Sequence, residues 1–233
     1  MKKIALLCLG LLFTFCSSPT KKSMTVVGKI DGLRKGTLYL QKLEDTLLVT
    51  VDSIEIKGDD GFVLSDDVKS PEFYFLSMAK DDGDSLTEKI LFFGEKGEIK
   101  INTLLRTFES SAKIEGSENQ LLWNEYQSIM RKFNKQNLDS LEKFIGKDSD
   151  LSLLERSQKL EEANRKTMKR KFLYALNFAM NNADKELAAY IGAYEVSNVA
   201  PIFLDSLYKK LTPQVKASKY GLAFKQQIDS LVR

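Results

Sequence analysis

Apolar and polar positions alternate along the chain from Met24 to Gly116. Short runs rich in Val, Ile, Leu, Phe and Tyr are separated by turn pairs such as Asp31-Gly32 and Asp60-Gly61. A period of two is typical of strands that bury one face. It predicts eight strands, over residues 25–30, 37–43, 48–56, 62–65, 72–79, 89–93, 98–102 and 112–115. The spacing leaves no room for crossover helices, so we expect antiparallel pairing in a β-sandwich-like domain, residues 24–116.

After Gly116 the apolar positions repeat at helical spacing instead. Ser117 and Gln120 have the pattern of a capping box, which predicts that a helix begins there. Two apolar stripes follow, Leu122, Tyr126, Ile129, Met130 and Phe133 in the first and Met168, Phe172, Ala175, Leu176 and Ala179 in the second. The pattern predicts an all-α helical domain over residues 117–233 and an α+β chain. No Pro-, Gly- or Ser-rich linker separates the halves, so we expect one cooperative unit.

The first eighteen residues have the order of an export signal. Lys2 and Lys3 form a basic N-terminal region, residues 4–15 are an apolar run, and Cys16 begins a segment of small and polar residues. The run is shorter than the roughly 20 residues of a membrane-spanning helix. A cysteine directly after such a run resembles a bacterial lipoprotein signal, in which that cysteine is lipidated. We therefore predict a signal peptide over residues 1–15, lipid attachment at Cys16 and a tether over residues 16–23.

Residue counts exclude several kinds of chemistry. Besides Cys16 the chain has only Cys8, inside the predicted signal peptide, and it has no histidine. A disulfide, a Cys-x-x-Cys redox pair, a zinc site with histidine ligands and a Ser-His-Asp triad are therefore impossible in the processed chain. The formal net charge is +3, of which Lys2 and Lys3 supply two, and this balance argues against nucleic acid as a partner. We expect no cofactor, no metal and no catalysis.

Several short segments resemble the DUF4369 family, a domain of unknown function. They are Val27-Gly28-Lys29-Ile30, Gly36-Thr37-Leu38-Tyr39-Leu40, Val51-Asp52-Ser53, Gly61-Phe62, Pro71, Gly116-Ser117-Glu118-Asn119 and the later Ser218-Lys219-Tyr220-Gly221. The resemblance implies the N-terminal scaffold of a Gram-negative lipoprotein, which usually precedes a thioredoxin-like domain. The chain ends at Arg233, where that domain would start, so we expect the scaffold and its envelope location without thiol chemistry.

Two aromatic residues and one polar pair are candidate site residues. Trp123 is the only tryptophan, and with Tyr126 it is a candidate platform for stacking a sugar ring; packing in the core is the alternative that we favour. Asp52 and Ser53 are candidates for binding a ligand, although the favoured interpretation is that they form side-chain to backbone hydrogen bonds at a strand bend.

Two charged runs invite further interpretations. Asp81-Asp82-Gly83-Asp84 invites a calcium site, but it lacks the spacing of a calcium-binding loop, so a hairpin turn is favoured. Residues 165–171 are the most basic run. Glu161 and Glu162 precede Arg165 and Lys166 by four positions, which favours a helix face that pairs its own charges over a patch for anionic lipid or an acidic partner.

These observations support three functional hypotheses. The leading one is a non-catalytic cell-envelope lipoprotein that serves as a binding or assembly module, held by its lipid at the outer membrane and facing the periplasm, with an unidentified protein partner. The second is a glycan-binding or glycan-active envelope protein that uses carboxylates. The third is an accessory to a separate thioredoxin-like lipoprotein. Exposed aromatic side chains along a groove favour the second, and an apolar surface patch favours the first.

Overall fold

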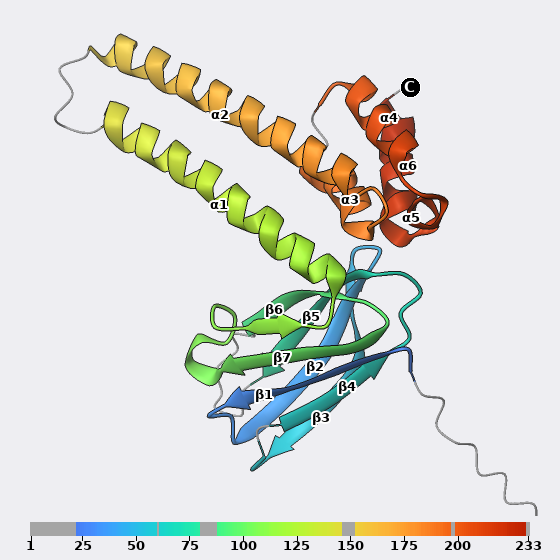
Figure 1. Cartoon of the computed structure of the whole chain (residues 1–233). Coiled ribbons are helices and arrows are strands. Elements are labelled where there is room, and N and C mark those ends of the chain that lie inside the picture. Colours follow the sequence, from blue (N-terminus) through green and yellow to red (C-terminus); the bar gives the residue numbers. More distant parts are fainter. Residues whose placement is uncertain (1–21, 60, 80–87, 146–151, 197–198, 232–233) are drawn as a thin grey trace, which may run out of the picture.

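Two sheets pack face to face in the N-terminal half of the computed structural model, which describes residues 22–59, 61–79, 88–145, 152–196 and 199–231 (Figure 1). The strands of this described part are β1 (Met24–Asp31), β2 (Lys35–Glu44), β3 (Leu47–Lys57), β4 (Gly61–Asp66), β5 (Glu72–Ala79), β6 (Glu88–Gly94), β7 (Gly97–Leu104) and β8 (Lys113–Glu115). One sheet, sheet A, has the order β4-β1-β7-β8, and the other, sheet B, has the order β3-β2-β5-β6. The eight predicted strands are confirmed.

The pairing is antiparallel in both sheets except between β1 and β7. These two strands run parallel, with Val26 opposite Ile99 and Gly28 opposite Ile101. Between β1 and β7 the chain crosses to the second sheet and back twice, through β2 and β3 before β4 and through β5 and β6 after it. That crossing provides the long connection which a parallel pair needs, so the pair forms without a helix and the expectation of purely antiparallel pairing is wrong at this one place.

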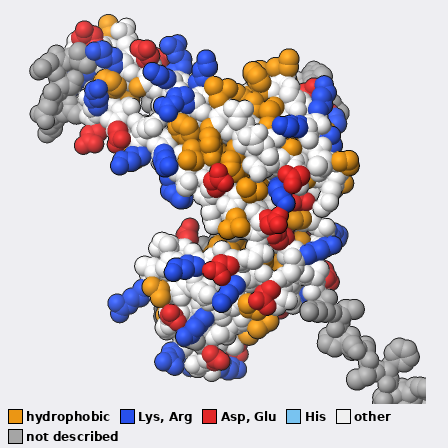
Figure 2. All heavy atoms as spheres, in the orientation of Figure 1, with side chains coloured by type: hydrophobic (Ala, Val, Ile, Leu, Met, Phe, Trp, Pro, Cys, Tyr) orange, Lys and Arg blue, Asp and Glu red, His pale blue; other side chains and the backbone are white. Residues whose placement is uncertain are grey.

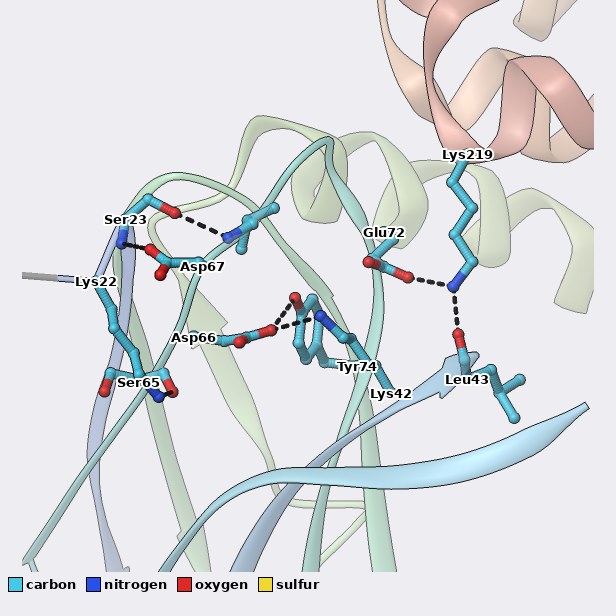
Figure 3. Close-up of polar contacts among 11 residues, drawn as sticks. Lys22, Ser23, Lys42, Leu43, Ser65, Asp66, Asp67, Glu72, Tyr74 and Lys219 are labelled. Carbon is cyan, nitrogen blue, oxygen red and sulfur yellow. Dashed lines mark hydrogen bonds and ion pairs between the residues drawn. The ribbon is translucent and has the colours of Figure 1, made fainter. Parts of the chain in front are cut away.

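The interior of the sandwich is apolar, and a partly buried ion pair joins its two sheets. Met24, Val26 and Leu40 have no exposed surface, as the alternating pattern requires. The Lys42 Nζ donates to Asp66 Oδ2 at 2.8 Å, and the Tyr74 hydroxyl donates to the same oxygen at 2.8 Å (Figure 3). Because Asp66 ends β4 in one sheet while its two partners lie in the other, this contact joins the sheets.

The sandwich also holds the last two residues of the expected tether. Lys22 donates to the backbone carbonyl of Ser65 at 3.1 Å, and the Ser23 backbone N–H donates to Asp67 at 3.0 Å (Figure 3). The Val68 N–H in turn donates to the Ser23 hydroxyl at 2.8 Å. These contacts fix the start of the described part of the chain, at Lys22, to the sandwich. Residues 1–21, which include Cys16, lie outside the described part.

The second half is helical, as the pattern predicts. Helices α1 (Glu118–Ile145) and α2 (Leu153–Asn181) form a long antiparallel hairpin, whose base contacts α3 (Glu186–Tyr190), a π-helix η2 (Ile191–Glu195) and α4 (Pro201–Lys210) (Figure 1). Helices α5 (Pro213–Ala217) and α6 (Lys219–Leu231) pack in turn against α3. Gly116 joins the halves with a φ of 97°, and a Cβ there would lie 2.1 Å from the Glu98 carbonyl oxygen. Only glycine suits this junction.

The predicted capping box at the start of α1 is half formed. The Gln120 N–H donates to the Ser117 hydroxyl at 3.0 Å, as a cap requires. The Gln120 side chain does not return to the Ser117 backbone, however; its oxygen accepts the backbone N–H of Phe93 at 2.7 Å. Phe93 lies on β6, the edge of its sheet, where no further strand satisfies the N–H. The first turn of α1 therefore supplies the hydrogen-bond acceptor for a backbone N–H at the edge of the sheet.

The two halves share one apolar core at their junction. Phe73 on β5 and Phe93 on β6 face each other with ring centroids 4.5 Å apart, and both belong to the buried cluster of the helices. Tyr74 and Phe92, the next residues on the same strands, belong instead to the core inside the sandwich. This end of sheet B is therefore covered on both faces, which explains why β5 is apolar at successive positions.

We expect the two halves to unfold together. Phe73→Ala removes a ring that contacts both, so it should lower the free energy of unfolding by about 3–5 kcal/mol. Trp123 fluorescence and far-UV circular dichroism should still report a single, coincident transition. Leu222→Ala, at a site 61% exposed on α6, is the control and should change little. Two separated transitions would show independent domains.

A second expected outcome concerns the partly buried carboxylate of Asp66. Burial alone acts to raise the pKa of Asp66, but hydrogen bonds from Lys42 and Tyr74 outweigh it and lower the pKa. A lowered folded-state pKa stabilises the fold above the ordinary value near 4, and this contribution disappears as pH falls through the lowered value. Asp66→Asn should therefore cost about 2 kcal/mol at pH 7, and the difference from the parent should shrink in acid. Denaturation at several pH values measures it, with Asp139→Asn at an exposed site on α1 as the control. A difference that is independent of pH would refute the assignment.

Candidate functional site

A pocket with aromatic walls opens where the sandwich meets the helices. Its volume is 360 Å³, and it is lined by Leu43, Asp45, Phe73, Phe75, Leu91, Tyr190, Tyr194, Lys219 and Tyr220. These residues come from β2 and the turn after it, from β5 and β6, and from α3, η2 and α6. The pocket therefore exists only in the assembled chain.

The helical wall of the pocket depends on the π-helix. Tyr190 is the last residue of α3 and Tyr194 lies in η2, so the wider turn sets the direction of both rings. Gly192 lies between them, and a Cβ there would lie 2.4 Å from the ring of Phe224 on α6. The close approach of Phe224 fixes η2 against α6. Single-turn π-helices are frequent at functional sites.

The aromatic side chains pack around Tyr190: Phe73 and Tyr220 lie edge to face with it, and Tyr194 has its ring tilted. The ring centroid of Tyr190 lies 4.8 Å from that of Phe73, 5.2 Å from Tyr194 and 5.1 Å from Tyr220. Phe73 and Tyr220 are buried and form the floor, whereas Tyr194 is 55% exposed and stands at the rim. Leu43 and Leu91 complete the rim at 42% and 36% exposure. The opening of the pocket is therefore lined by exposed apolar side chains, and packed aromatic rings form its floor.

The polar groups of the pocket are mostly bound within the protein. Lys219 donates to the Glu72 carboxylate and to the Leu43 carbonyl (Figure 3). The Phe73 N–H donates to the Tyr220 hydroxyl at 2.8 Å. Asp45, at a φ of 54° in the turn after β2, is exposed. These contacts fix the turn and α6 relative to β5, and they leave the apolar surfaces facing the opening.

Two tyrosine hydroxyls of the pocket, those of Tyr190 and Tyr220, are protonated at neutral pH. Burial, together with the nearby Glu195 and Tyr194, raises the pKa of Tyr190 to about 12. Burial also raises the pKa of Tyr220 strongly, although the hydrogen bond with the Phe73 N–H acts in the opposite direction. Neutral phenols donate hydrogen bonds but do not act as bases near pH 7. The arrangement suits binding of an apolar or aromatic group.

A larger hollow lies at the other end of sheet B and is less suited to a ligand. Its volume is 770 Å³, and its walls are Arg34, Lys35, Gly36, Thr37, Glu55, Ile56, Lys57, Gly58 and Ala79. The charged side chains of this set are exposed, and only Gly36 and Ile56 are buried. Strongly hydrated walls of this kind give little gain when a ligand displaces water.

The aromatic residues predicted as a platform, Trp123 and Tyr126, lie behind the pocket. Tyr126 is 1% exposed, and its hydroxyl donates to Glu195 at 3.2 Å. Trp123 is half-buried against the core, with its ring centroid 5.0 Å from Phe73 and 5.8 Å from Tyr190. The structure thus places both in core packing, the favoured alternative, and Trp123 touches the residues that form the pocket wall.

Asp52 has the structural role that the sequence favours. Its carboxylate accepts the N–H of Ser53 at 2.9 Å and that of Ser65 at 2.8 Å, so it joins β3 to β4. The register of β2 and β3 shifts between Leu40 and Gln41, beside this residue. The bend at Asp52 is therefore a β-bulge held by side-chain hydrogen bonds.

The remaining charged candidates have different outcomes. Asp81, Asp82 and Asp84 lie outside the described residues, as does Cys16. Arg165–Lys171 lies on α2, where Thr167 is buried and Arg170 donates to Gln136 on α1 at 3.3 Å. Among the residues described, no ion pair joins Glu161 or Glu162 to Arg165 or Lys166, so the predicted self-pairing of this face is absent.

Sequence reasoning missed the pocket itself. Tyr190 and Tyr194 lie four residues apart, which is compatible with one helix face, but a helical period says nothing about a facing sheet. Lys219 and Tyr220 lie in the segment Ser218-Lys219-Tyr220-Gly221 that carries part of the family resemblance. That resemblance was the one available signal.

The described residues contain neither a metal-binding cluster nor a membrane-spanning helix. No group of three or more His, Cys, Asp or Glu residues there is arranged to hold a metal ion. No helix in this described part combines the length and the apolar character needed to cross a membrane.

Comparison with known proteins identifies one family. The model of the domain of unknown function DUF4369 matches residues 24–123, which are the whole sandwich and the first residues of α1. No curated protein and no solved structure matches the chain. The match covers the strands, the Gly116 junction and Trp123 behind the pocket. Over residues 24–123 the chain is therefore similar to the DUF4369 family.

Proposed function

We propose that this protein is a non-catalytic cell-envelope lipoprotein whose aromatic pocket binds an apolar or aromatic group of a protein partner. The observation that carries the proposal is the rim of the pocket, where Tyr194, Leu43 and Leu91 are exposed around a buried aromatic floor. An exposed aromatic residue over a rigid floor is the arrangement found at the energetic centres of protein interfaces.

The polar contacts of the pocket support binding over catalysis. Lys219, the one basic group in the lining, is engaged by Glu72 and Leu43, and the phenols of Tyr190 and Tyr220 are held protonated. Acid–base chemistry with carboxylates needs two such groups facing one substrate. The lining contributes one, Asp45.

Glycan binding is the second candidate function. Tyr194 favours it, because a ring 55% exposed can stack on a sugar face. A sugar also needs several free hydrogen-bonding groups, and the lining supplies Asp45 and the tyrosine hydroxyls. The apolar rim fits a protein side chain better.

Site-specific crosslinking tests the pocket. A photoreactive amino acid in place of Tyr194 should give a covalent adduct with a partner protein in intact cells, and the second substitution Leu91→Asp should reduce that adduct about tenfold or more. The control is the same photoreactive residue in place of Val63, 61% exposed on β4, alone and with Leu91→Asp. Equal adducts at both positions, or none at Tyr194, would refute the proposal.

The chemical nature of the adduct separates the alternatives. A protease-resistant carbohydrate adduct would favour glycan binding, and a thioredoxin-like protein as the partner would favour the accessory hypothesis. Trp123 fluorescence adds a measurement in solution, because its ring contacts Phe73 and Tyr190. Binding in the pocket should change this emission in the parent and much less in the Leu91→Asp variant.

The proposed anchor has its own test. Cys16→Ala removes the thiol that lipidation requires, so the variant should appear in the soluble fraction or remain unprocessed. Stable anchoring needs more than one acyl chain, which lipoprotein processing supplies. Membrane fractionation and metabolic labelling with a fatty acid measure the result, and Ser17→Ala is the matched control. A Cys16→Ala protein that is processed, labelled and membrane-bound like the parent would exclude the lipoprotein assignment.

A further inference from the structure

The outer part of the α1–α2 hairpin carries a groove with apolar walls. The groove has a volume of 490 Å³ and is lined by Asn134, Asn137, Leu138, Leu141, Leu160, Asn164 and Met168. Leu138 is 64% exposed, Met168 61% and Leu141 43%. Met168 extends the apolar stripe of α2 beyond its buried part at Ala175 and Leu176. Burial of these side chains against a second surface would remove apolar area from water and so favour association.

The described elements do not cover this groove. Figure 1 shows the outer part of the hairpin projecting beyond both the sandwich and the C-terminal helices. At the base of the hairpin, Phe133 packs against Tyr174 and Tyr126 against Phe178. Further out, the seam position that follows Phe133 by four is Asn137, whose side-chain oxygen is buried without a hydrogen-bond donor in the described residues. The hairpin is thus well packed at its base, whereas further out a buried polar atom in the seam has no hydrogen bond within the described residues.

The charges beside the groove change sign along the hairpin. Arg131 and Lys135 lie toward the base of α1, whereas Glu142 lies toward the tip, and Glu161 lies toward the tip on α2. All four side chains are exposed, and none has an ion pair within the described part of the chain. Figure 2 shows Lys and Arg side chains gathered along the hairpin. This order of charges is self-complementary when two hairpins meet head to tail.

We propose that the groove binds the same groove of a second copy, antiparallel about a two-fold axis near Leu138, so that two hairpins form a four-helix bundle. Lys135 precedes Leu138 by three residues and Glu142 follows it by four, so they lie about 5 Å before and 6 Å after it along α1. The two-fold axis then places Lys135 of each copy opposite Glu142 of the other. A symmetric interface of this kind needs a surface that complements itself.

The asparagines fit the same arrangement. An amide group both donates and accepts hydrogen bonds, so Asn134, Asn137 and Asn164 can pair with their counterparts across the axis. A polar asparagine within an otherwise apolar helical seam fixes register and the number of helices. The inference does not depend on the function proposed for the pocket.

Charge reversal tests the orientation as well as the surface. In the full chain, Lys135→Glu should weaken self-association about tenfold or more, because it faces Glu142 of the second copy. Adding Glu142→Lys should restore the parent affinity. Lys113→Glu on exposed β8 makes the same change in net charge and should have no effect. Sedimentation velocity over a concentration series measures the association of all four proteins.

Cysteine crosslinking locates the axis. In the full chain with Cys8 and Cys16 replaced by serine, Leu138→Cys should form a disulfide-linked dimer under mild oxidation, since the axis passes beside it. Leu222→Cys, 61% exposed on α6, should remain monomeric. Both substitutions are at exposed sites, and circular dichroism checks that each variant is folded.

Three results would overturn the proposal. The first is a parent chain that stays monomeric in sedimentation at all concentrations, and the second is a dimer that Leu138→Cys does not crosslink. The third is a double reversal that associates no better than Lys135→Glu alone. A different protein bound in the groove in place of the second copy would give the first of these results.

Discussion

The assembled structure depends on two backbone N–H groups at the end of sheet B. The ladder between β2 and β5 ends with the pair Lys42 and Tyr74, so Phe73 has no strand to bond on that side. Its N–H donates to the Tyr220 hydroxyl, and the N–H of Phe93 on the edge strand donates to Gln120. A buried N–H without an acceptor costs about 1–3 kcal/mol. The helices thus complete the hydrogen bonding of the sheet as well as its apolar cover.

The same constraint produces the pocket. Tyr220 reaches Phe73 only if α6 begins against β5, and Lys219 holds that position by bonding Glu72 and the carbonyl of Leu43. The turn after β2 is thereby drawn against the C-terminal helices, and the space left between the turn, β6 and η2 is the pocket. On the other side of the junction the Asn119 side-chain amide donates hydrogen bonds to the carboxylates of Glu95 and Glu186. Burial raises the pKa of Glu186 there.

Local patterns predicted the elements of the fold but not the contacts between them. The eight strands and the change to helices at Gly116 follow from period and turn residues, which act over a few positions. Gln120 was predicted to cap its own helix, because the pattern contains no information about β6. The pairing of β1 with β7 and the pocket residues Tyr190 and Tyr194 likewise depend on residues far away in sequence. Met168 continues the apolar period of α2 but is exposed. The period shows which face a residue shares, and it cannot show how far along the helix that face is covered by other elements.

The two proposed surfaces lie far enough apart to be used together. The pocket is at the junction with the sandwich, where α1 begins at Glu118, and the groove begins at Asn134. Sixteen residues of helix separate these positions, about 24 Å along α1. Two copies joined through their hairpins would therefore leave both pockets open. Because the hairpin extends from a base that is fixed to the sheet by Gln120 and Asn119, the joined pair would hold its two pockets at a set distance, which favours a partner that offers two matching groups.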